Sequence, residues 1–163
     1  MDQIDILSGL RPDSEVYRAR RERPEFVDGA ELCRETVLAP RHDFGIGHAM
    51  RAALAARMAR FIGREDLART YDAMLEEAGR DHELAVIAST VELPESADGF
   101  TKALVRHADF VTKTPRGATR ADIERLEAAG FSNPQIIALS ELIAFVNFEA
   151  RVIVGLSVLE LLA

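Results

Sequence analysis

The sequence predicts an all-α protein built as one domain. Apolar residues recur at three- and four-residue spacing along almost the whole chain, and no long stretch alternates apolar and polar residues as a half-buried strand does. Residues that cap helix starts, and glycines or prolines that end helices, separate these stretches. A chain of 163 residues suits a single core. We therefore expect one domain over residues 1–163, with a helical extension at about residues 1–40.

The N-terminal extension should contain two helices. Asp13 or Ser14 can cap a short helix that stops before Pro24, and Pro24 suits the first turn of a second helix that runs to about Leu38. One face of this second helix holds Phe26, Ala30, Cys33 and Val37. We expect this apolar face, and Cys33 with it, to point inward.

A pair of helices should follow a loop in the middle of the chain. The loop is the Pro- and Gly-rich segment APRHDFGIGH, residues 39–48, and an alanine-rich helix starts at its last residue, His48. Gly63 separates this helix from a second one that runs to about Ala78 and has Gly79 as its C-cap. The sides of the first helix that lie away from its apolar face carry Arg51, Arg57 and Arg60.

Four further helices complete the expected chain. One starts at about Asp81 and ends at Pro94, and the next carries apolar residues from Phe100 to Val111 and breaks at Pro115. A short helix then closes at Gly130. Its start is marked by the capping box of Thr119 and Asp122. The start of the last helix is marked by Ser132, Pro134 and Gln135.

The last helix is unusually long and apolar. Some 28 residues would span about 42 Å, and the apolar residues cover more than one side of the helix. Neighbouring subunits could cover part of this surface, so we expect a homo-oligomer. A membrane span is the rival explanation. We disfavour it because the helix is interrupted by Glu141, Asn147, Glu149 and Arg151.

Composition excludes several classes of function. With 20 Lys and Arg against 27 Asp and Glu, the net charge is -7, which disfavours general binding to nucleic acid or anionic membranes. The arginine-rich segment at residues 18–23 is expected to be a solvated helix face. The acidic N-terminus lacks a signal segment, so we expect a cytoplasmic protein. The one cysteine, Cys33, excludes an internal disulfide and a multi-cysteine zinc site.

The second half of the chain resembles a known family. The segments ATRADIERLEAAGFS and IIALSELIAFVNFEARV, after a compact central helix pair, resemble the carboxymuconolactone decarboxylase and AhpD-like (alkylhydroperoxidase-like) family. The resemblance covers about residues 45–160 and is to the peroxidase-related branch, within an uncharacterised subgroup. It implies an AhpD-like helical fold assembled as trimers, hexamers or dimers.

The resemblance also shows what this chain lacks. Redox members of the family carry a Glu, a Cys-x-x-Cys and a His, because two thiols one helical turn apart form a disulfide and the other two groups move protons. With Gly63 aligned to the family's glycine, those positions hold Ala52, Arg64, Leu67 and Tyr71. The nucleophile, the resolving thiol and the proton relay of the family are therefore all absent.

Other residues offer weaker candidates for chemistry. Cys33 could be a relocated reactive thiol, although an apolar helix face favours an inert one. His48 lies in the first turn of its helix and would suit proton transfer if a pocket opened there. No two of the four histidines have the helical spacing of a local metal site, so we expect no metal and no cofactor. These histidines are His42, His48, His82 and His107.

Polar residues of the last helix leave two interpretations open. Asn147, Glu149 and Arg151 could form an intersubunit hydrogen-bond network, or Arg151 could bind a ligand carboxylate in a pocket that Arg64 and Tyr71 also line. Two functions follow from these alternatives, and whether the protein is an enzyme stays open. One is a catalytically degenerate peroxidase-related oligomer that can pair with a cysteine-bearing relative. The other is a thiol-independent enzyme or binder of a small carboxylated or lactone-like molecule.

Overall fold

The computed structural model describes all 163 residues and contains helices but no strand, which confirms the all-α prediction. Nine α-helices and one short 3-10 helix follow one another along the chain. The first five are α1 (Gln3–Ser8), α2 (Glu15–Arg21), α3 (Pro24–Leu38), α4 (His48–Phe61) and α5 (Glu65–Ala78). The others are α6 (His82–Ala88), α7 (Gly99–Lys113), η1 (Pro115–Gly117), α8 (Arg120–Ala128) and α9 (Asn133–Leu162).

The alanine-rich helix α4 is the centre of the core. All nine residues from Arg51 to Ala59 are buried, because α5, α6, α7 and α9 pack around the helix on all sides. Alanine side chains are short enough to let four neighbouring helices approach one axis closely. Arg51 and Arg57 lie away from the apolar face as expected, but their sides of α4 are buried too.

Both buried arginines hold loop backbone in place. Arg51 donates through Nε and Nη1 to the carbonyl oxygens of Ile46 and Val37 at 2.7 and 2.8 Å. Arg57 pairs with Asp109 on α7 and donates to three carbonyl groups at the end of α6 and in the segment that follows it, among them that of Val91 at 3.0 Å. These buried cations are satisfied by several acceptors each, so they fasten irregular segments to the core.

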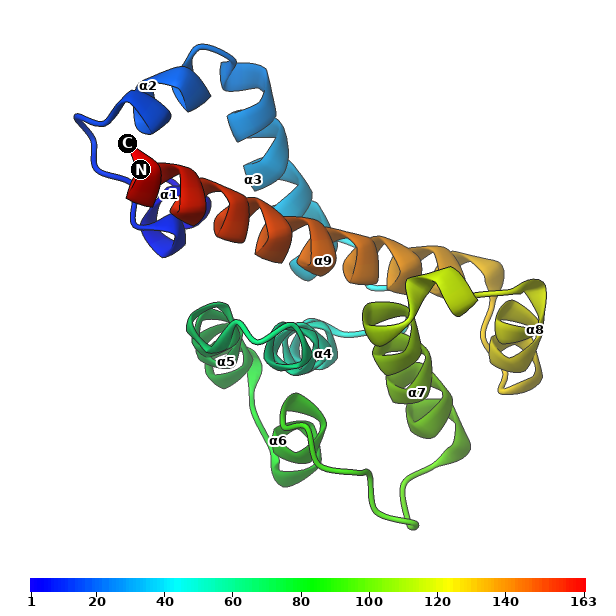
Figure 1. Cartoon of the computed structure of the whole chain (residues 1–163). Coiled ribbons are helices and arrows are strands. Elements are labelled where there is room, and N and C mark those ends of the chain that lie inside the picture. Colours follow the sequence, from blue (N-terminus) through cyan, green and yellow to red (C-terminus); the bar gives the residue numbers. More distant parts are fainter.

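Helix α9 crosses the whole molecule, with the N-terminal helices at one end and α8 at the other (Figure 1). Its 30 residues span about 45 Å. Helices α1, α3, α4 and α7 of the same chain cover one side of it, so much of its apolar surface needs no neighbouring subunit. By length and composition alone, α9 is also long and apolar enough to cross a membrane. Its charged residues therefore do not exclude a membrane span, contrary to the argument made from the sequence.

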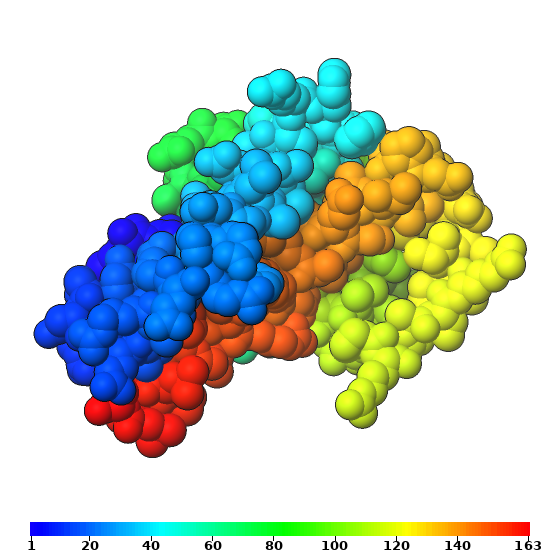
Figure 2. Space-filling model, turned by 90° about the horizontal axis from the view of Figure 1, so that it is seen from above, coloured from blue at the N-terminus to red at the C-terminus, as the bar shows by residue number.

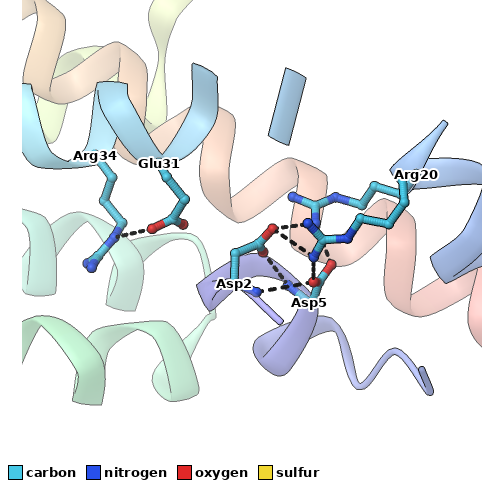
Figure 3. Close-up of polar contacts among 6 residues, drawn as sticks. Asp2, Asp5, Arg20, Glu31 and Arg34 are labelled. Atoms are coloured by element: carbon cyan, nitrogen blue, oxygen red, sulfur yellow. Dashed lines mark hydrogen bonds and ion pairs between the residues drawn. The ribbon is translucent and has the colours of Figure 1, made fainter. Parts of the chain in front are cut away.

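Helix α1 was not predicted, although its signals are present in the sequence. Asp2 and Asp5 form a capping box, and Gly9 ends the helix with a left-handed φ of 67°. The same two carboxylates pair with Arg20 and Arg21 of α2, with Arg20 Nη1 2.7 Å from Asp2 Oδ2 (Figure 3). The expectation of a solvated arginine-rich face is therefore wrong for these two arginines, which join α2 to α1.

Candidate functional site

The helix junction at Gly63 is filled by packed side chains. Gly63 has a φ of 79°, which reverses the chain after α4 and lets the Arg64 N–H donate to the Ala59 carbonyl at 2.9 Å. Ala52, Leu67 and Tyr71 are 2%, 0% and 0% exposed. Three of the four positions that the sequence resemblance aligned with reactive groups thus belong to the hydrophobic core.

Arg64, the fourth position, binds the N-terminal extension. Its guanidinium pairs with Asp66 at 2.5 Å and donates to the Leu7 carbonyl at 3.3 Å. Close by, Gln3 donates to the Thr70 hydroxyl at 3.0 Å, so α1 is attached to the start of α5 at two points. Arg64 contacts α1 here, and Tyr71 lies sealed in the core, so these two residues do not line a cavity together with Arg151.

Tyr71 instead forms a buried pair with Glu149 of α9. The Tyr71 hydroxyl donates to Glu149 Oε2, and the two side chains are at most 1% exposed. The other carboxyl oxygen, Oε1, is sealed from solvent and accepts no hydrogen bond from the protein. Arg34 of α3 is the neighbouring cation; its Nη1 lies 3.8 Å from Met74 Sδ, and its Nε lies 3.6 Å from a carboxyl oxygen of Glu31 (Figure 3).

Burial sets the protonation of this pair. Burial raises the pKa of Glu149, while the hydrogen bond from Tyr71 and the charge of Arg34 oppose that rise. Burial and the nearby Glu149 carboxylate also raise the pKa of Tyr71 well above its usual value. Each shift favours the protonated form of the group concerned.

Asn147 and Arg151 do not join Glu149 in one network, because they lie on another side of α9. Arg151 Nη1 donates to the backbone and side-chain oxygens of Asn147 at 2.8 and 2.9 Å. Asn147 in turn donates to the Ile143 carbonyl at 2.9 Å. The three residues therefore split into a buried acid and a separate polar pair that faces outward.

That polar pair lines a surface hollow, which we call the Arg151 hollow. It has a volume of about 520 Å³, within the usual range for small-molecule sites. Figure 2 shows the surface hollowed between the orange part of α9 and the yellow segment of η1 and α8. The polar side chains at its wall include His107, Arg120, Ser140, Asn147 and Arg151.

Cys33 points outward, so the expectation of an inward thiol is wrong. Helix α3 packs on the core through Val27, Ala30 and Leu38, whereas Phe26 is 63% exposed. At 100° per residue, Cys33 lies about 100° around the helix from the centre of the buried face. The spacing of apolar residues therefore predicted a buried face of α3 that is rotated around the helix axis from the face that the structure buries.

The histidines are dispersed over the molecule. His48 is exposed, and its Nε2 lies 2.9 Å from the Pro40 carbonyl, where it ties the loop to the first turn of α4. No group of three or more His, Cys, Asp or Glu side chains is placed to hold a metal ion. Only His107 is both buried and next to a hollow, a combination that helical spacing alone could not reveal.

Comparison with known proteins supports the fold. No protein-family model matches the chain, and no curated protein matches it either. The structure is similar to that of an uncharacterized peroxidase-related protein from Silicibacter sp. TM1040, with a TM-score of 0.65 and 14% sequence identity. The similarity covers 77% of this chain and 65% of that protein. The chain thus shares the all-α fold of a peroxidase-related protein.

Proposed function

We propose that this chain is a peroxidase-related helical protein that has lost thiol-dependent peroxidase activity. The observation that carries the proposal is the filled junction, where Ala52, Leu67 and Tyr71 are core residues and no thiol is present. Thiol-dependent reduction of a hydroperoxide needs an accessible thiolate and a neighbouring group that moves a proton. The one thiol, Cys33, lies outward on α3, with no second thiol in the chain to resolve a sulfenic acid.

A hydroperoxide assay with a dithiol reductant tests this proposal. We expect the protein and its Cys33→Ser variant to consume peroxide at the same rate as the reductant alone. Turnover well above that rate that disappears in Cys33→Ser would overturn the proposal. An added cysteine-bearing relative tests a partner-dependent role, because the mixture would then turn over faster than the relative alone.

We also propose a homo-oligomer that forms through the uncovered side of α9. Large apolar side chains remain exposed along this side, which is unusual for a surface without a partner. They are Ile137, Phe148, Val158, Leu159 and Leu162. Light scattering at micromolar concentration should give a dimer, trimer or hexamer, and Phe148→Glu should shift the mass toward the monomer. A stable wild-type monomer would contradict this assembly.

The Arg151 hollow favours a second function, the binding of a small carboxylated molecule without thiol chemistry. Arg151 is exposed and has no carboxylate partner in the chain, and Asn147 holds its guanidinium in place through two hydrogen bonds. An oriented guanidinium suits a carboxylate because its donors match both oxygens. Calorimetric titration with butyrate should give weak binding that Arg151→Gln removes, whereas Arg69→Gln, an exposed arginine on α5, should leave it unchanged. Equal binding by both variants would rule out this site.

A further inference from the structure

A second hollow adjoins the Arg151 hollow and lies over the neighbouring side of α7. This Lys102 hollow has a volume of about 470 Å³ and lies between α7 and α8. Its wall includes Lys102, Arg106, Phe110 and Arg125. The two hollows share His107, Thr119 and Asp122, so they meet along one common wall.

His107 is the one group of that wall without a hydrogen-bond partner. Thr119 and Asp122 bond to each other in the capping box of α8, and Asp122 also pairs with Arg125. His107 is only 8% exposed, yet its imidazole takes part in no hydrogen bond within the chain, and neither ring nitrogen is fully sealed from solvent. Because both ring nitrogens reach solvent in the hollows, a ligand there can take the place of water as their hydrogen-bond partner.

The surroundings of His107 favour the neutral imidazole. Burial lowers the pKa of His107, the negative charge of Asp122 opposes that change, and Arg125 adds to it. A neutral imidazole offers one N–H donor and one acceptor nitrogen. It can therefore bind a ligand by hydrogen bonds without adding a charge of its own.

Uncompensated positive charge lies on both sides of His107. In the Lys102 hollow, Arg106 makes no ion pair, and Lys102 bonds only to the Glu95 carbonyl, at 2.5 Å. In the Arg151 hollow, Arg151 bonds only to Asn147. These three cations stand out in a chain with a net charge of -7.

Helix geometry explains the arrangement. Lys102 and Arg106 are four residues apart, so they lie one turn apart on the same side of α7. His107 follows at the next position, about 100° around the helix, where it forms the edge between the two hollows. The cations of the two hollows thus lie on either side of the shared wall that contains His107.

We propose that the two hollows form one binding site for a small organic molecule with two anionic groups, one held by Lys102 and Arg106 and the other by Arg151. The imidazole of His107 hydrogen-bonds the middle of this ligand. The proposal rests on the carboxylate-binding function proposed above and adds the second anionic group, the second hollow and the role of His107.

Titrations with succinate and butyrate test the proposal, because both have four carbons but only succinate has two carboxylates. We expect succinate to bind at least about ten-fold more tightly by calorimetry, as an added charge-assisted contact of about 1.4 kcal/mol would give. The double variant Lys102→Gln/Arg106→Gln should weaken succinate to the level of butyrate. Both side chains are on the surface, so this variant should fold normally. The ring resonances of His107 in NMR spectra should move with succinate in the wild type.

The outcomes separate this inference from the function on which it rests. If butyrate and succinate bind equally and only Arg151→Gln weakens them, the carboxylate site stands and the two-anion ligand is wrong. If neither probe binds at tens of millimolar, both proposals fail. If succinate binds more tightly but the His107 resonances do not move, the role of His107 is wrong. In every titration, Arg69→Gln should behave as the wild type does.

Discussion

The hydroxyl group of Tyr71 should stabilise the fold through its hydrogen bond to Glu149. Tyr71→Phe removes the one hydrogen bond that Glu149 receives from the protein and leaves both carboxyl oxygens buried without a donor. An unsatisfied buried polar group costs about 1–3 kcal/mol. With an unfolding entropy of about 2.1 cal/mol/K per residue, a loss of about 2 kcal/mol lowers the Tm of a chain this size by roughly 6 °C.

The loss should depend on pH. Burial already raises the pKa of Glu149 above its ordinary value of 4.5, and the Tyr71 hydrogen bond partly offsets that rise, so the variant raises the pKa further. A carboxyl group with a raised pKa binds its proton more tightly in the folded state. The stabilisation that comes from binding this proton is therefore complete below the ordinary pKa, and it is lost as pH rises toward the pKa of the folded state. The destabilisation by Tyr71→Phe should be larger at pH 8 than at pH 5.

Urea unfolding followed by circular dichroism measures this effect at both pH values. All samples need the same protein concentration, because self-association would change apparent stability. Tyr17→Phe is the matched control, since Tyr17 is the only other tyrosine and its hydroxyl makes no hydrogen bond within the chain. The reasoning is refuted if the two variants are equally stable at pH 8, or if Tyr71→Phe is destabilised more at pH 5.

Three further predictions concern other buried or exposed groups. Glu149→Gln keeps an acceptor for the phenol but removes the titrating proton, so the free energy of unfolding should fall less between pH 5 and pH 8. The same pH dependence as in the wild type, measured by urea unfolding, would contradict this. Arg57→Met leaves Asp109 and three carbonyl groups without their donor, so it should cost about 3 kcal/mol. By the same measurement, Arg120→Met at an exposed site should cost under about 0.5 kcal/mol. Cys33 should react with a disulfide reagent nearly as fast in the native as in the urea-unfolded protein, and strong native protection would show that α3 is covered.

Helix boundaries were largely predictable because their signals are local. Gly63, Gly79 and Gly130 stop helices or follow their ends, and each has a positive φ in the structure. The capping box of Thr119 and Asp122 starts α8 as expected. Helix α1 was not predicted because its six residues are too few to show a helical period of apolar residues, although its capping residues are present.

The candidate site was much less predictable. Leu67 and Tyr71 are core residues, but Glu149, the partner of Tyr71, is 78 residues away in the sequence. The role of Arg57 depends on carbonyl groups, which every residue has, so no side-chain pattern marks its acceptors. His107 could only be recognised once two hollows were seen to meet at it.

The sequence by itself determined the all-α fold, the helix ends and the absence of a thiol pair, because caps, glycines and residue counts act within a few positions of the chain. The tertiary structure decided that Cys33 faces outward, that Glu149 accepts a hydrogen bond from Tyr71, and that Arg151 borders a hollow. Each of these depends on which side of a helix meets a distant neighbour. Packing of the whole core sets that orientation, and a rotation of about 100°, one residue step, exchanges a buried side chain for an exposed one.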